Sequence, residues 1–145
     1  MLKINKFFTV KSYKPGIAWF FIASILLLIP GPDLPITIDW LDKIFFDKWV
    51  HLFLFGMLTY FLLVPYCKKQ VFTNDKKHYA MIVSLAICSW ALAIEFIQKN
   101  FVKGRSYELS DWLAGCTGVL IALLFIWRKY IPFANLFRSM TASFE

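Results

Sequence analysis

The sequence has 145 residues and a formal net charge of +7, with 59% hydrophobic and only 17% charged residues. Soluble proteins contain about 45–50% apolar residues, and a soluble domain of this size buries only about two-thirds of its unfolded surface. A chain this apolar cannot bury all of its hydrophobic surface by folding alone. The composition therefore excludes an ordinary soluble domain.

The positive charge does not indicate nucleic-acid binding, because the basic residues flank apolar blocks and form no basic helix face. An anionic membrane surface suits this pattern better. The cysteines Cys67, Cys88 and Cys116 lie within or beside apolar runs and match neither a disulfide framework nor a zinc pattern. We therefore expect the lipid bilayer as a partner and no nucleic acid, with the cysteines serving as packing residues.

Four apolar blocks follow one another along the chain, and each indicates a transmembrane helix, which needs about 20 residues. Pro15 suits the first turn of the first helix and Pro30 suits its end. The first and last blocks are short and must borrow flanking residues. With no internal repeat or linker, residues 1–145 are predicted to form a single domain, an all-α membrane protein built as a compact bundle of four transmembrane helices. The expected helices are at about 15–31, 48–66, 78–98 and 110–130.

The orientation follows from the positive-inside rule. Eleven of the sixteen basic residues precede the first block, lie between the second and third blocks, or follow the fourth, whereas seven of the nine acidic residues lie in or beside the other two loops. Both termini are therefore predicted to be cytoplasmic. The loops at 31–48 and 98–111 are predicted to face outward from a multi-pass membrane protein.

Polar side chains gather at the outer ends of the last three expected helices. Asp47 and His51 are spaced i,i+4, and Lys48 and His51 i,i+3, so each pair can share a helix face. Charged groups at bilayer depth cost a few kcal/mol each, so they normally face the bundle interior and pair. We expect Arg105 or Lys48 to pair with the acidic residues at positions 95 and 111, with Gln98 bridging. The predicted outward-facing cluster is Asp47, Lys48, His51, Glu95, Gln98, Arg105 and Asp111.

Simpler roles exist for several members of this cluster. Asp47 and Asp111 suit the first turns of helices, where acidic groups complement the helix dipole. Lys48 can extend to the headgroups, and His51 can be a packed histidine bonded to Asp47. Glu95 is harder to explain in this way, because it follows a long apolar run and needs a partner.

Small residues predict close helix packing in two blocks. Gly56 lies within the second block, and Gly115 and Gly118 are spaced i,i+3 near the start of the fourth. Glycines let helix backbones approach closely in lipid.

Taken together, DKWVH at 47–51, EFIQ at 95–98 and KGRSYELSD at 103–111, followed by a helix containing Gly118, resemble the VanZ-like family of small bacterial membrane proteins. The resemblance covers roughly residues 15–130. In one departure, Gly115 stands where the family usually has Asn. The family's namesake is associated with low-level resistance to teicoplanin, a lipoglycopeptide that binds cell-wall precursors at the outer membrane face. The resemblance therefore implies a multi-pass protein of the bacterial cytoplasmic membrane, a cell-envelope protein linked to teicoplanin resistance.

Three roles for the cluster remain open at this stage. In the first, Lys48, Gln98 and Arg105 bind an anionic or amphiphilic headgroup, such as a lipid-linked cell-wall precursor, a phospholipid or the lipoglycopeptide, because a guanidinium suits phosphate or carboxylate. In the second, the chain is a membrane-embedded hydrolase or transferase acting on a lipid headgroup. The candidate acid–base residues are Asp47, His51, Glu95 and Asp111.

The ligand set for a divalent metal is present but unspecific, and the sequence requires no cofactor. In the third role, the cluster only locks the helices together, and function lies in partner binding.

Overall fold

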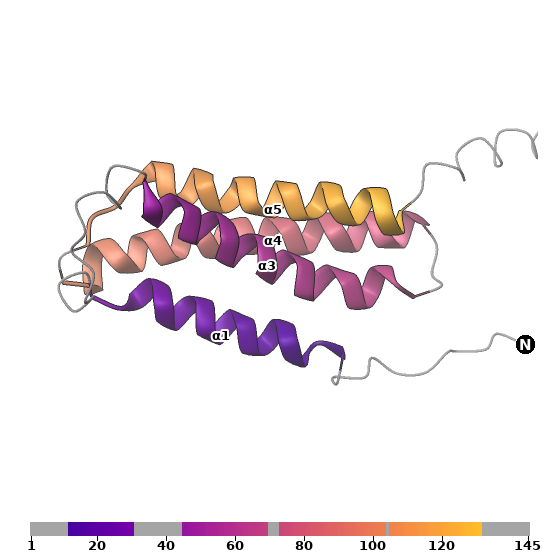
Figure 1. Ribbon diagram of the computed structural model, residues 1–145, viewed down its shortest axis with the longest axis horizontal. Coiled ribbons are helices and arrows are strands. Elements are labelled where there is room, and N and C mark those ends of the chain that lie inside the picture. The colour runs from indigo at the N-terminus through magenta and orange to yellow at the C-terminus, as the bar shows by residue number, and fades with distance from the viewer. Residues whose placement is uncertain (1–11, 31–44, 70–72, 104, 132–145) are drawn as a thin grey trace, which may run out of the picture.

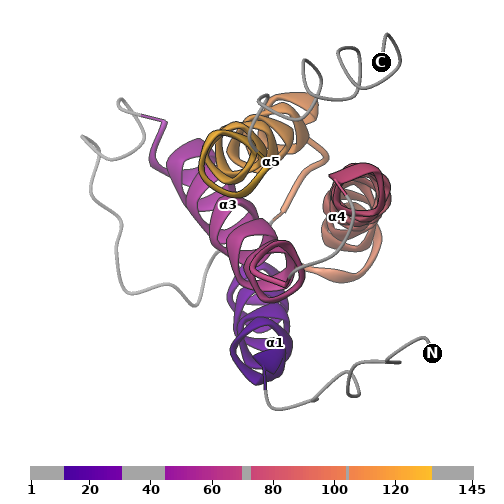
Figure 2. The same ribbon diagram turned by 90° about the vertical axis from the view of Figure 1, so that its right-hand side faces the viewer.

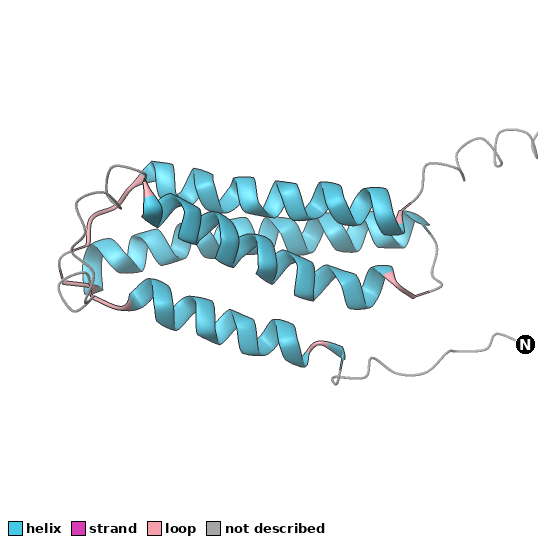
Figure 3. Ribbon diagram, viewed as in Figure 1, coloured by secondary structure: helices cyan, strands magenta, loops and turns pink. Residues whose placement is uncertain are grey.

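The computed structural model of the chain describes residues 12–30, 45–69, 73–103 and 105–131. Within these ranges all regular secondary structure is helical (Figure 3), which confirms the all-α prediction. The helices are α1 (Lys14–Leu28), α3 (Phe46–Cys67), α4 (Thr73–Phe101) and α5 (Leu109–Tyr130).

Three of the described helices, α3, α4 and α5, are long and apolar enough to cross a membrane. The fourth block gains the flanking length it was expected to need, because α5 continues to Tyr130. The described part of α1 has 15 residues, or about 22 Å at 1.5 Å per residue, which is less than the roughly 30 Å of a hydrocarbon core. Residues 31–44 and both chain ends lie outside the described residues, so a fourth span and cytoplasmic termini stay predictions.

The helices lie alongside one another, and α3 has the central place (Figures 1 and 2). Seen end-on, α3 lies between α1 and α5, while α4 lies to one side. Among the described helices, α3 contacts α1, α4 and α5, and α4 contacts α1 and α5 as well. Helix α4 begins at Thr73, earlier than the expected residue 78, because the polar residues before its apolar stretch already follow helical geometry.

Glycines bring α3 and α5 together, as their spacing predicted. A Cβ added to Gly118 would overlap the carbonyl oxygen of Leu52, and one added to Gly56 would lie 3.2 Å from the carbonyl oxygen of Gly118. The two backbones therefore touch directly, an approach that only residues without side chains permit.

The outside of the bundle is apolar. Large hydrophobic side chains on every described helix are exposed, among them Phe21, Phe53, Leu85 and Leu124. Monomeric soluble proteins rarely expose apolar surface on this scale. The exterior suits lipid, and polar groups gather at one end.

Candidate functional site

The polar end of the bundle is where α3 begins, α4 ends and α5 begins, the left-hand end of Figure 1. The structure brings all seven predicted side chains to this end and arranges them in two layers. The inner layer consists of His51, Glu95 and Gln98, and the outer layer of Asp47, Lys48, Arg105 and Asp111.

The inner layer centres on a pair of side chains that are both fully buried. Nδ1 of His51 lies 3.4 Å from Oε1 of Glu95, and both residues have 0% exposure. The other carboxylate oxygen of Glu95 accepts a hydrogen bond of 3.3 Å from the backbone N–H of Glu108. Within the part of the chain that the structure describes, neither nitrogen of His51 makes a hydrogen bond. A buried histidine with no hydrogen bond is unusual, because buried polar groups are normally satisfied.

The outer layer is built from ion pairs. Nζ of Lys48 lies 3.2 Å from Oδ1 of Asp111 and 3.2 Å from Oε2 of Glu108. Nη1 of Arg105 donates a hydrogen bond of 2.9 Å to Oδ2 of Asp47. The Lys48 side chain keeps 30% of its surface exposed and that of Glu108 keeps 50%. The outer layer is thus partly exposed, except for Asp111, which is buried at 4% exposure, whereas all three residues of the inner layer are buried.

The predicted pairing of Lys48 with Asp111 is confirmed, but other expected partners are wrong. Arg105 pairs with Asp47, because it lies before α5 and reaches across to the first turn of α3. The contact of His51 is Glu95 on the neighbouring helix, and Asp47 is held by Arg105.

Gln98 does not bridge the charged groups. Its Nε2 donates a hydrogen bond of 2.7 Å to the backbone carbonyl of Leu27. The last four carbonyls of a helix have no partner within the helix, and Leu27 belongs to the last turn of α1. Gln98 therefore ties α4 to the end of α1.

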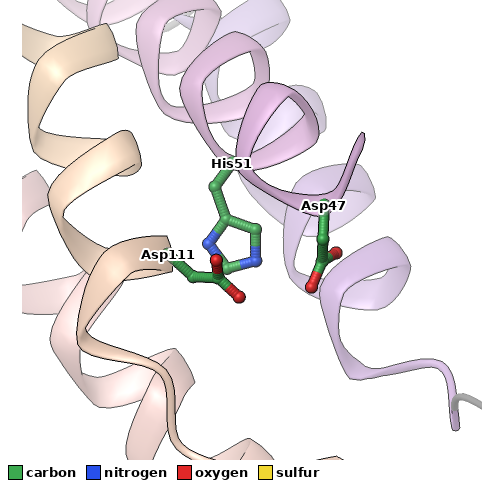
Figure 4. A group of neighbouring side chains, drawn as sticks. All are labelled: Asp47, His51 and Asp111. Atoms are coloured by element: carbon green, nitrogen blue, oxygen red, sulfur yellow. The ribbon is translucent and has the colours of Figure 1, made fainter. Parts of the chain in front are cut away.

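A tighter group of three side chains spans both layers. Potential ligand atoms of Asp47, His51 and Asp111 all lie within 4.8 Å of one another. Figure 4 shows the imidazole of His51 together with the two carboxylates, one from α3 and the other from α5. The i,i+4 spacing accounts for Asp47 and His51 sharing a face, while helix packing brings in Asp111.

Glu108 is the member that the sequence reasoning missed. It contacts the outer layer through its carboxylate and the inner layer through its backbone N–H. The available signal was its position directly before the first residue of α5, three residues ahead of Asp111.

The Gly115 position has a packing explanation. A Cβ added there would lie 2.9 Å from Cδ2 of Phe55, a ring that is only 1% exposed. An asparagine at this position would have to displace the ring. Phe55 fills the space next to His51, with 6.1 Å between the ring centroids, so the glycine and the phenylalanine form one packing unit beneath the cluster.

Fold and site together define a small helical protein with three candidate membrane spans and a partly buried polar cluster at one end. Comparisons with models of known protein families, with curated proteins and with solved structures found no match to this chain.

Proposed function

We propose that this chain is a VanZ-like, multi-pass protein of the bacterial cytoplasmic membrane, with four spanning helices and both termini in the cytoplasm. Three apolar helices of spanning length support the membrane assignment. The distribution of lysine and arginine supports the orientation, and in this orientation the polar cluster would lie on the outer side.

Reporter fusions test this orientation. Green fluorescent protein attached after residue 145 is expected to fluoresce, and alkaline phosphatase inserted after residue 38 is expected to be active, because the first folds only in the cytoplasm and the second only outside it. The reversed pattern would overturn the orientation. Activity of the same reporter at both positions would overturn the four-span topology, because three predicted spans separate residues 38 and 145.

The polar cluster, we infer, binds the anionic headgroup of a lipid or lipid-like amphiphile at the outer leaflet, the role that would connect it to lipoglycopeptide resistance. The observation that carries this proposal is Lys48, a partly exposed cation at the mouth of the cluster. Asp111 fixes its ammonium group from the buried side, while Glu108 occupies its exposed side. Arg105 pairs with Asp47, the residue directly before Lys48, and 16% of its side chain is exposed.

Glu108 marks the position that a headgroup oxygen would take. Its carboxylate is half exposed and lies 3.2 Å from Nζ of Lys48. Exposed ion pairs contribute only about 0–1 kcal/mol, so a phosphate oxygen can replace this carboxylate at little cost. Glu108 then acts as a competitor of the ligand.

Opposite effects of two charge-removing substitutions test this binding mode. Lys48→Gln is expected to weaken binding of phosphatidylglycerol about tenfold, which corresponds to about 1.4 kcal/mol, because a charge-assisted contact is lost. Glu108→Gln is expected to strengthen it several-fold. The measurement is native mass spectrometry of the detergent-purified protein titrated with phosphatidylglycerol, with phosphatidylcholine as the zwitterionic comparison.

Lys103→Gln is the matched control, since Lys103 is an exposed lysine before α5 and its loss changes the net charge equally. It is expected to leave binding unchanged. Equal effects of Lys48→Gln and Lys103→Gln would show general electrostatic attraction and contradict a defined site.

The buried His51–Glu95 pair favours a second candidate function, catalysis on the bound headgroup. A histidine beside a carboxylate in a site shielded from water is a common general acid–base arrangement, and Lys48 and Arg105 can stabilise developing negative charge. The lipid recovered from the same titrations distinguishes the two functions. Unmodified phosphatidylglycerol indicates binding, whereas a converted headgroup that disappears with Glu95→Gln indicates catalysis.

A further inference from the structure

Carboxylates outnumber cations within the polar cluster. Among the described residues, the carboxylates of Asp47, Glu95, Glu108 and Asp111 form ion pairs or close contacts with two basic side chains and one histidine. With all four carboxylates ionised and His51 neutral, this group of side chains holds two more negative than positive charges. Glu95 and Asp111 are buried, with 0% and 4% exposure, and uncompensated charge in such a place is costly. A divalent cation would restore the balance.

Three side chains are placed to hold such a cation. The ligand atoms of Asp47, His51 and Asp111 lie within 4.8 Å of one another, and both carboxylates lie around the imidazole of His51 (Figure 4). In a tetrahedral site, metal–ligand bonds of about 2.0–2.2 Å put the ligand atoms about 3.3–3.6 Å apart, so the three side chains would have to approach one another by at most about 1.5 Å. Each aspartate uses one oxygen in its ion pair, Oδ2 in Asp47 and Oδ1 in Asp111, and the other oxygen is left for a metal.

The surroundings of His51 are those of a metal-binding histidine. Its Nδ1 faces Glu95, which leaves Nε2 for coordination. Ligating histidines almost always donate their second ring N–H to a carboxylate or carbonyl group, which fixes the tautomer and orients the ring. Glu95 is itself held by the backbone N–H of Glu108. Both nitrogens of His51 are buried and make no hydrogen bond within the described residues, and a metal at Nε2 would satisfy the one that Glu95 does not face.

We propose that Asp47, His51 and Asp111 bind one divalent transition-metal ion of the Zn²⁺ or Mn²⁺ type, through Nε2 of His51 and one oxygen of each aspartate. Glu95 is then a positioning residue that acts through His51. Three protein ligands leave at least one coordination position open, and a water or an anionic oxygen can take it. The metal site does not depend on headgroup binding.

Metal binding is measured on the full chain in detergent, without added lipid. The protein is treated with a chelator, desalted, titrated with Zn²⁺ or Mn²⁺, and analysed for retained metal and for its melting temperature. We expect one ion per chain and a rise in Tm, because a ligand that binds only the folded state stabilises it. Glu95→Gln is expected to weaken binding about 10- to 100-fold, as changes to the partners of ligating histidines do. His51→Gln should weaken it further.

Two further variants keep the test decisive. His78→Gln removes the other histidine, an exposed residue near the opposite end of α4, and should leave metal affinity unchanged. Asp47→Asn changes a ligand whose side chain is 44% exposed, so it tests the site even if the buried His51→Gln variant fails to fold.

The proposal is overturned if wild-type protein retains no metal, or if Asp47→Asn retains it with wild-type affinity. A loss of affinity in His78→Gln would also overturn it. Titration of the metal-free protein with phosphatidylglycerol reports on headgroup binding separately.

Discussion

Gly118→Ala is expected to lower the stability of the protein by about 3 kcal/mol or more, at or beyond the upper end of the usual cost of overpacking. The new methyl group would overlap the carbonyl oxygen of Leu52 and lie 3.1 Å from the backbone nitrogen of Gly56. Backbone atoms of a helix cannot move aside individually, so α3 and α5 would have to separate along their contact. Thermal unfolding in detergent, with gel filtration to detect aggregation, measures the effect.

Two other glycines provide graded controls. In Gly115→Ala the methyl group would lie 2.9 Å from a ring carbon of Phe55, and a ring can shift. In Gly56→Ala the nearest atom, the carbonyl oxygen of Gly118, is 3.2 Å away. Both variants should lose clearly less stability than Gly118→Ala. Similar melting temperatures for all three would contradict the direct contact of the two backbones.

Substitution of either member of the His51–Glu95 pair is expected to have the second large effect. Leaving a buried polar group without its partner costs about 1–3 kcal/mol, and more when that group is charged, whereas replacing both partners with apolar groups of the same shape is nearly neutral. We therefore expect His51→Leu and Glu95→Leu each to destabilise the chelator-treated protein strongly, and the double variant to lose less than the two single losses combined. Additive losses would show that the two side chains do not interact.

Polar substitutions of similar size address the role in which the cluster only locks the helices. If His51→Gln, Glu95→Gln and Asp111→Asn keep the wild-type melting temperature but lose phosphatidylglycerol or metal binding, a purely structural role fails. If all three unfold, the binding proposals lose their main support and helix locking explains the cluster.

The helices were predictable because hydropathy and segment length largely determine them. The apolar run from Tyr79 to Ile97 could hardly be anything but a helix in lipid. Their bounds were less predictable, because hydropathy does not register polar helical turns such as the one beginning at Thr73. For the same reason hydropathy did not determine where the first helix ends. Its described part ends at Leu28.

The topology predicted which residues gather at the polar end of the bundle, but it did not predict which side chains pair with each other. Helical spacing places Asp47 and His51 on one face, yet it contains no information on how α3 and α4 are rotated against each other. That rotation, produced by packing around Phe55, directs His51 to Glu95. Gln98 was misjudged because its partner is a backbone carbonyl of α1. Every residue except proline offers both a backbone donor and an acceptor, so the sequence does not single out one of them as a partner.

Glu108 contacts both layers of the site, so it can couple binding in one layer to binding in the other. Its carboxylate contacts Lys48 at the surface, while its backbone N–H holds Glu95 inside. A ligand that displaces the carboxylate therefore perturbs the hydrogen bond to Glu95, and whatever binds beside Glu95 perturbs the carboxylate. Such coupling between two binding events must be reciprocal. We expect that an ion bound at His51 alters headgroup affinity by the same factor by which the headgroup alters affinity for the ion.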